Sequence, residues 1–477
     1  MSAPAAPPAA VLVRATDAGD TYLTWRWLDD PAHPEFAVLP AASVGAAGEL
    51  LAAALPTALP GETPAEGVRR ALTRGPFATP AAERELSAAL TETVFPPRLR
   101  EQIAARARAG ERVLVRLTPS PRLARIPWEL LFVTAGRRLL EVAELVHEPP
   151  AAVHAERPRL PEQWQRVRGR PVLLVIDPPM PRGATGLGPV LDRADQVLFA
   201  RRLSELAAAG RLPRAERADA IRSTTRLDLH KALATPRSRL FFLGHVSARA
   251  DEPGSAALHL SDTARIWGTA TPLGRPGPDG RPRADPDAHR PFAALDLFLG
   301  TVDADERVWR RYGDAGPQRG HELWPMPARV ALIACDGHAD FRAEETFGLV
   351  VAMIHAGAEL VTTTRWTLPA DREFRGLPGA RADTRPVTEL ALRVDAAHET
   401  ADPVADLTAW QRARLRAWST GAADPADGTP LVWASPTHTV APARAVVAAR
   451  PPGGAGGAPA PPPPPPPRTR GGGRGGG

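Results

Sequence analysis

The stretch Ala328-Arg-Val-Ala-Leu-Ile-Ala-Cys335 decides the fold class of this chain. Its apolar run predicts a buried strand, and Asp336-Gly337, directly after the only cysteine, predict where that strand ends. A second apolar run, residues 238–244, ends in the same way, in a glycine followed by His245. We therefore expect two core strands that carry a histidine and a cysteine to their carboxyl ends, where open α/β sheets place their chemistry.

Predicted strands and helices alternate around these two runs. The continuous apolar run 171–176 predicts a central parallel strand buried on both faces. Helical periodicity follows over residues 192–208 and 227–235, and again over 343–355 after the cysteine, before a strand at 359–364. This order predicts an α/β fold with a doubly wound, mostly parallel sheet and helices on both faces. The last predicted elements are surface helices over 386–396 and 404–418 and a final strand over 431–434.

A cysteine and a histidine at neighbouring strand ends are typical of a Cys-His hydrolase. Each residue alone has an ordinary explanation, because a lone cysteine is commonly a small buried hydrophobe and a histidine after a strand is commonly a polar loop residue. The pairing favours catalysis, since a nucleophile needs a base near it in space but not in sequence.

Short motifs in a fixed order surround the two residues. Residues 126–131 read Ile-Pro-Trp-Glu-Leu-Leu, residues 242–245 read Phe-Leu-Gly-His, and residues 332–335 read Leu-Ile-Ala-Cys. After them come Glu345, Gly348-Leu349, Ala356-Gly357-Ala358 and Arg365-Trp366. Over roughly residues 90–440 the chain resembles the CHAT family of caspase-like cysteine peptidases, which belongs to the clan of caspases, separases and metacaspases.

The resemblance implies a caspase-like fold and a His-Cys dyad, with His245 as general base and Cys335 as nucleophile. It also implies an oxyanion hole formed by the backbone N–H groups of Cys335 and of Val246, a position where the family usually has a smaller residue. The implied activity is that of a cysteine endopeptidase, latent until a partner activates it, in bacterial signalling or defence. The alternative is a catalytically inactive caspase-like scaffold or protein-interaction module.

Two acidic residues are candidates for substrate binding. Asp177 follows the 171–176 strand and Asp336 lies beside the cysteine, so both could bind an arginine or lysine before the cleaved bond. For both, the alternative is a turn or capping residue. In the 126–131 motif we expect a structural role, with Trp128 and Leu131 in the core and Glu129 hydrogen-bonded to nearby backbone.

The chain divides into three parts. Residues 1–89 form an N-terminal β/α addition, in which strands near 11–14 and 21–27 pair across a turn and either build a cover module or extend the main sheet. Residues 90–445 form the caspase-like domain, whose catalytic half spans about 170–440. Pro, Gly and Arg dominate residues 446–477, which predicts a disordered tail. The Gly- and Pro-rich segment 268–291 predicts a mobile loop near the site.

Composition limits the classes of partner that we expect for this protein. The net charge is +6, but Lys231 is the only lysine and the arginines alternate with acidic residues, so we expect no specific nucleic-acid binding. We expect no membrane span either, because no apolar run is long enough. A free thiol suits a reducing cytoplasm. The expected partners are a protein or peptide substrate and an activating protein.

We expect neither a metal nor a cofactor. His338 lies three residues after Cys335, but zinc sites need three or four protein ligands and the chain has no second cysteine. His259, His321 and His355 are alternative bases, but they lack the strand and glycine that precede His245.

Overall fold

The computed structural model describes residues 7–181, 187–213, 221–248, 254–273, 285–336 and 346–441. For Cys335 and Asp336 it describes the backbone. The predicted tail at 446–477, His338 and Glu345, and the middle of the predicted 268–291 loop lie outside these ranges.

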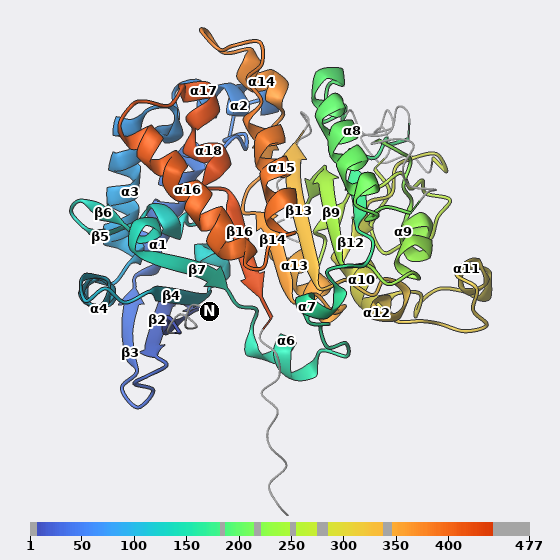
Figure 1. Ribbon diagram of the computed structural model, residues 1–477, viewed down its shortest axis with the longest axis horizontal. Helices are drawn as coiled ribbons and strands as arrows, with labels where there is room; N and C mark the ends of the chain where they lie inside the picture. Colours follow the sequence, from blue (N-terminus) through green and yellow to red (C-terminus); the bar gives the residue numbers. More distant parts are fainter. Residues whose placement is uncertain are drawn as a thin grey trace, which may run out of the picture. The chain divides into compact units, whose positions relative to one another are not determined.

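The main sheet of the described chain consists of two blocks of mostly parallel strands that run in opposite directions, with β2 antiparallel to both of its neighbours in the first block. Its order is β3-β2-β1-β4-β7-β16-β14-β13-β9-β8, with β15 beside β13. β16 pairs parallel with β7 and antiparallel with β14, so it forms the seam between the blocks (Figure 1). The strands are β1 (Ala9–Ala18), β2 (Asp20–Trp27), β3 (Glu35–Leu39), β4 (Val113–Thr118), β7 (Ala143–His147), β8 (Leu173–Ile176), β9 (Arg239–Gly244), β13 (Arg329–Asp336), β14 (Leu360–Thr364), β15 (Leu368–Pro369) and β16 (Pro436–Val440).

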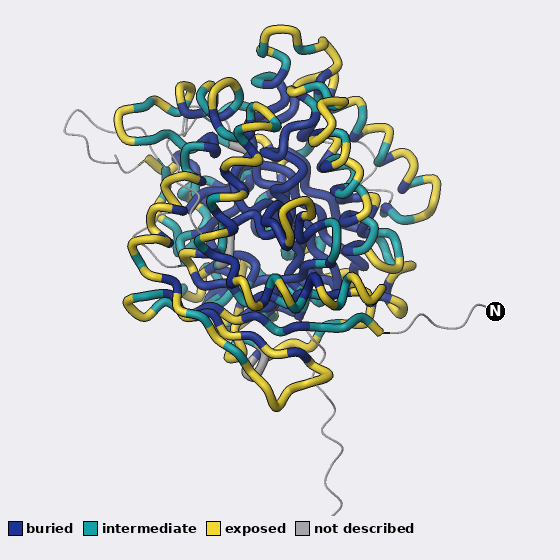
Figure 2. Tube along the Cα trace, turned by 90° about the vertical axis from the view of Figure 1, so that its left-hand side faces the viewer, coloured by how far each residue is buried: buried dark blue, intermediate teal, exposed yellow. Residues whose placement is uncertain are grey.

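Helices cover both faces of the block formed by β14, β13, β9 and β8. α8 (Arg193–Ala208), α15 (Pro386–Ala397) and α16 (Pro403–Ser419) lie in front of the sheet in Figure 1, and α13 (Thr346–His355) lies behind it. Phe241 and Leu243 of β9 belong to the core cluster that includes Leu390 of α15. Leu240 and Phe242 belong to a second cluster with residues of α9 (Arg226–Leu233), α10 (Ala294–Leu299) and α13. The apolar run of β9 is continuous because both faces of this strand are buried. Figure 2 shows that buried residues fill the interior of the molecule.

The N-terminal strands extend the same sheet. β1 and β2 form the predicted antiparallel pair around Gly19, and β1 pairs parallel with β4. The helices before β8 are α1 (Ala41–Ala54), α2 (Pro64–Thr73), α3 (Pro80–Val94), α4 (Pro97–Arg108), α5 (Leu139–Val142), α6 (Ala151–Glu156) and α7 (Trp164–Val167). Three 3-10 turns lie between them: η1 (Pro76–Ala78), η2 (Pro121–Leu123) and η3 (Trp128–Leu130). β5 (Phe132–Thr134) and β6 (Arg137–Arg138) form a small hairpin.

Two sequence predictions about strands are wrong. The 171–176 run gives β8, which is the last strand of the sheet and not a central one, although all four of its residues are buried. Residues 431–434 do not form a strand. Residues 431–433 lie in the short helix α18 (Pro430–Trp433), and residue 434 follows its end. Thr429 caps this helix by accepting a hydrogen bond from the Leu431 N–H, and the last described strand is β16. Two surface helices were predicted at 386–396 and 404–418, but α15 and α16 bury whole faces.

An insertion between β9 and β13 builds a second, three-stranded sheet in the described residues. β10 (Val246–Ser247) pairs with β11 (Ala257–Leu258), which pairs with β12 (Phe292–Ala293). Part of the predicted 268–291 loop is ordered here, because Leu273 and Thr263 both form bridges with His289. The insertion also contains the short helices α11 (Glu306–Arg311) and α12 (Gly320–Leu323). Two further short helices, α14 (Asp371–Arg375) and α17 (Pro425–Gly428), lie after β15 in the chain.

Candidate active site

Strand register brings the two candidate catalytic positions to one edge of the sheet. β9 and β13 are parallel neighbours, and Gly244 pairs with Ala334. His245 and Cys335 come next along their strands, at neighbouring backbone positions, and adjacent strands lie about 4.8 Å apart. Cys335 also pairs with Leu368 of β15. The Cys335 side chain is outside the described part, so the His-Cys dyad stays a prediction.

The imidazole of His245 is buried and oriented by a carbonyl group. Its Nε2 lies 2.8 Å from the carbonyl oxygen of Gly188, and its residue is 5% exposed. A carbonyl only accepts, so Nε2 must carry the proton, and the neutral ring then keeps its lone pair on Nδ1. Nδ1 is therefore the atom of His245 that can take up a proton. Because every residue type has a backbone carbonyl group, the sequence does not indicate that Gly188 contacts His245, and this contact was not predicted.

The segment that carries Gly188 is fixed by Asp177. The Asp177 carboxylate accepts hydrogen bonds from the backbone N–H groups of Val190, at 3.1 Å, and Leu191, at 3.0 Å. Asp177 has a φ of 42°, an uncommon value for a residue other than glycine, and its N–H donates to Leu243 of β9. Burial raises the pKa of the carboxyl group, against the effect of the two N–H groups. Asp177 thus positions the acceptor that orients His245, while its predicted contact with substrate stays a prediction.

A second residue anchors the same segment. Arg372 of α14 donates to the carbonyl oxygen of Pro189 at 2.7 Å. The three residues that follow Gly188 are therefore held at two points, by Asp177 at the end of β8 and by Arg372 on α14.

The N–H of Val246 points away from the small sheet. His259 donates its backbone N–H to the carbonyl oxygen of His245, which makes these two residues a hydrogen-bonded pair of the β10-β11 ladder. Val246 and Leu258 are then the next, non-hydrogen-bonded pair, whose N–H groups face outward. The Val246 side chain is buried in the same core cluster as Phe292. A β-branched residue is therefore accommodated in the core here, and the oxyanion role of Val246 and Cys335 stays a prediction.

Of the other candidate residues, Asp336 lies at the same strand end as Cys335, whereas His321 and His355 lie apart from it. Asp336 is the last residue of β13, in register with Pro369, and only its backbone is described. The rings of His321 and His355 lie 5.8 Å apart. His355 ends α13, the helix that returns from the carboxyl edge of β13 to the start of β14, so this pair is far from the strand ends. Within the described ranges, no group of three or more His, Cys, Asp or Glu residues could hold a metal ion.

Two of the motifs quoted above meet in the core. Arg365 donates from Nη2 to Glu129 Oε1 at 2.5 Å and from Nη1 to the carbonyl oxygen of Ile126 at 2.5 Å. Both side chains are almost fully buried, and burial raises the pKa of Glu129. Trp128 and Leu131 are buried as predicted. Glu129 has a backbone contact, as predicted, and in addition a partner that was not predicted, Arg365. These motifs join the two blocks of the sheet and are not part of the edge at which β9 and β13 end.

Comparisons with known proteins found similarities in sequence and in structure. The family model described as CHAT domain matches residues 84–373, more than half of the chain. No curated protein matches the chain in sequence. Among solved structures, a crystal structure of the Saccharomyces cerevisiae separase-securin complex is similar with a TM-score of 0.43 and 9% identity, over 91% of this chain and 30% of that chain. The chain therefore spans less than a third of that larger protein. Among the described residues, no helix is long and apolar enough to cross a membrane.

Proposed function

The chain belongs to the CHAT domain family, and on that premise we propose that it is a cysteine endopeptidase with Cys335 as nucleophile and His245 as general base. The observation that supports the proposal is the register of β9 and β13, in which the residues before His245 and Cys335 are paired. The carbonyl group of Gly188 orients the ring of His245.

The proposed reaction is acyl transfer to sulfur. His245 Nδ1 takes the proton of the Cys335 thiol, and the thiolate adds to the carbonyl carbon of a peptide bond. The N–H groups of Val246 and Cys335 stabilise the oxyanion. The protonated imidazole then gives its proton to the leaving amine as the C–N bond breaks. Water, deprotonated by the same ring, hydrolyses the thioester and releases the acid.

The proposal includes the substrate and the control of the site. Asp177 and Asp336 favour arginine or lysine before the cleaved bond. Latency is consistent with the burial of His245, so an activating partner protein in a bacterial signalling or defence system, acting in the cytoplasm, would have to open the site. A peptide library cleaved by the activated protein should show the basic preference, and equal cleavage after apolar residues would remove it.

Alkylation tests the dyad directly, because Cys335 is the only cysteine and every labelled thiol is therefore this residue. We expect iodoacetamide at pH 6.5 to label the wild type at least tenfold faster than His245→Ala, since an ordinary thiol with a pKa of about 8.5 is hardly ionised there. His321→Ala is the control and should keep the wild-type rate. Equal rates for His245→Ala and wild type would instead favour the inactive scaffold.

A further inference from the structure

A row of hydrogen-bonded side chains lies next to the candidate active site and is not used by the proposed peptidase. His259 Nε2 is 2.8 Å from the hydroxyl oxygen of Ser247, and His259 Nδ1 is 3.1 Å from His289 Nε2. The rings of His259 and His289 stack with centroids 5.0 Å apart. All three side chains are buried. We call Ser247, His259 and His289 the serine cluster.

The direction of each hydrogen bond in the serine cluster follows from the acceptor at its far end, the carbonyl oxygen of Asp262. His289 Nδ1 lies 3.0 Å from the carbonyl oxygen of Asp262, so this nitrogen must donate. The neutral ring of His289 then accepts at Nε2 from the Nδ1–H of His259. His259 in turn accepts at Nε2, which leaves the Ser247 hydroxyl as the donor. Burial lowers the pKa of His259 and lowers that of His289 to about 4, so both rings are neutral at pH 7, as this chain of bonds requires.

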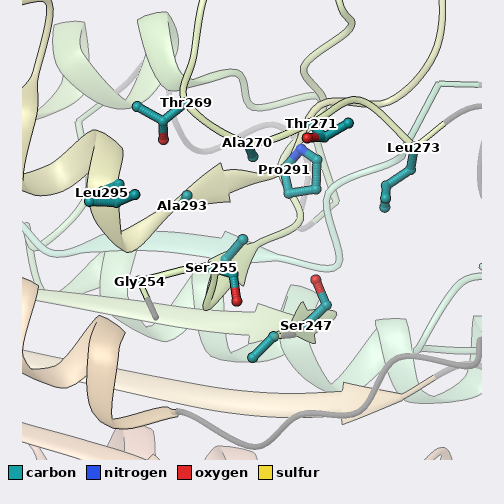
Figure 3. Close-up of a pocket in the computed structure, with 12 residues that line it drawn as sticks. Ser247, Gly254, Ser255, Thr269, Ala270, Thr271, Leu273, Pro291, Ala293 and Leu295 are labelled. Atoms are coloured by element: carbon teal, nitrogen blue, oxygen red, sulfur yellow. The ribbon is translucent and has the colours of Figure 1, made fainter. Parts of the chain in front are cut away.

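Ser247 also lines a pocket of its own. The pocket has a volume of about 60 Å³ and lies between the small sheet and residues 269–273. Figure 3 shows Ser247 and Ser255 on one side of it and Thr271 and Pro291 on the other. Its volume is well below the roughly 150 Å³ of a cavity that admits benzene. Only a short group fits against the Ser247 hydroxyl.

We propose that Ser247 is a second nucleophile, for which His259 is the base and His289 the residue that orients the base, and that it reacts with short-chain acyl esters. A serine within hydrogen-bond reach of a base whose other nitrogen is oriented by a third group is the general arrangement of an activated nucleophile. The proposal is independent of the peptidase activity, because it uses neither Cys335 nor the ring of His245.

The chemical step balances with water as the only co-reactant. Ser247 Oγ bonds to the ester carbonyl carbon while its proton moves to His259 Nε2. The bond to the leaving alcohol breaks, and the alkoxide takes that proton. Water then adds to the acyl-serine, again through His259, and Ser247 regains its proton as the short acid leaves. His289 accepts from His259 throughout as a positioning residue.

The test uses the full chain carrying Cys335→Ala, so that the thiol cannot contribute, with p-nitrophenyl acetate as the probe. We expect nitrophenol release above the buffer rate and acetylation at residue 247 by mass spectrometry. Ser247→Ala and His259→Gln should each reduce release at least tenfold, while Ser255→Ala, in the same pocket wall, should not. Release that is unchanged in Ser247→Ala, or no release by protein that retains its melting transition, would overturn the proposal.

A second variant tests activation without relying on the ester fitting the pocket. In the Cys335→Ala background, Ser247→Cys makes residue 247 the only thiol of the chain. We expect iodoacetamide to label it at pH 6.5 at least tenfold faster than when His259→Gln is added, and equal rates would contradict the role of His259. Because Cys335 is absent throughout, the outcome is separate from success or failure of the proposed dyad.

Discussion

Arg365 and Glu129 form an ion pair that is almost completely buried, and its loss should be costly. Arg365→Met leaves the Glu129 carboxylate in the core without its partner, and we expect the free energy of unfolding to fall by about 3–5 kcal/mol. Urea denaturation at pH 7 measures this. The control is Arg265→Met, whose partner Asp287 is exposed, with a much smaller expected loss of stability. Equal losses in the two variants would contradict the structural role of the pair.

His438 should make the fold sensitive to acid. Burial lowers its pKa to about 4, compared with about 6.5 when the chain is unfolded. Between these values the unfolded state binds a proton that the folded state does not, so stability falls as pH falls, by about 1.4 kcal/mol per pH unit for one such group. We expect His438→Gln to lose less stability than wild type between pH 6.5 and pH 5, measured by urea denaturation.

The difference between variant and wild type reports on His438 together with His147 and His398, whose pKa values His438 lowers. Burial raises the pKa of Asp195 and Asp262 to about 6, and these carboxyl groups stabilise the fold as pH falls, opposite to the histidine. Their effect is the same in both proteins and cancels in the difference. His33→Gln, at an exposed histidine, is the matched control and should keep the wild-type slope. A His438→Gln protein with that same slope would exclude the effect.

At the scale of elements, the connection from β8 to α8 depends on one carboxylate. Asp177→Ala removes both hydrogen bonds to the backbone of residues 190 and 191, so Gly188 is no longer held against His245. We expect Cys335 alkylation to fall about tenfold, a change of about 1.4 kcal/mol. Asp177→Asn keeps one acceptor oxygen and should give an intermediate rate.

Asp192→Ala is the control for this element. It removes the N-terminal cap of α8, just beyond the same connection, and should cost about 1 kcal/mol of stability while leaving the alkylation rate near wild type. If Asp177→Ala alkylates at the wild-type rate while Asp192→Ala does not, the positioning role of Asp177 is wrong.

The sequence predicts elements well where apolar periodicity alone decides them. β9 and β13 appear where their runs predict, because burial on both faces makes the residues after the first arginine of each strand an almost continuous apolar run. The same pattern cannot tell a central strand from a covered edge, which is why β8 was misplaced. It also cannot tell a strand from a helical turn over four apolar residues, and at 430–433 the cap by Thr429 and the proline after it decide for a helix.

At the scale of the whole molecule, the sheet edge that holds the two candidate residues could be predicted because strand ends are encoded locally. His245 follows a glycine and Cys335 precedes a turn signal, and parallel pairing then brings them together. What orients His245 could not be predicted, since it depends on a carbonyl group and on the unusual φ of Asp177. The partner of Glu129 is 236 residues away along the chain, and a salt bridge of that span leaves no local pattern.

The seam strand β16 has a consequence for how the protein is made. It is the last described strand, yet it lies between β7 and β14 and is the only described strand that links the two blocks of the sheet. During synthesis, domains generally fold as units from the N-terminus. Here the sheet cannot close before residue 440 has left the ribosome, so the two blocks must wait with open edges for the end of the chain. A ribosome-bound chain that stops short of β16 should therefore be cleaved by added protease much faster than the released protein.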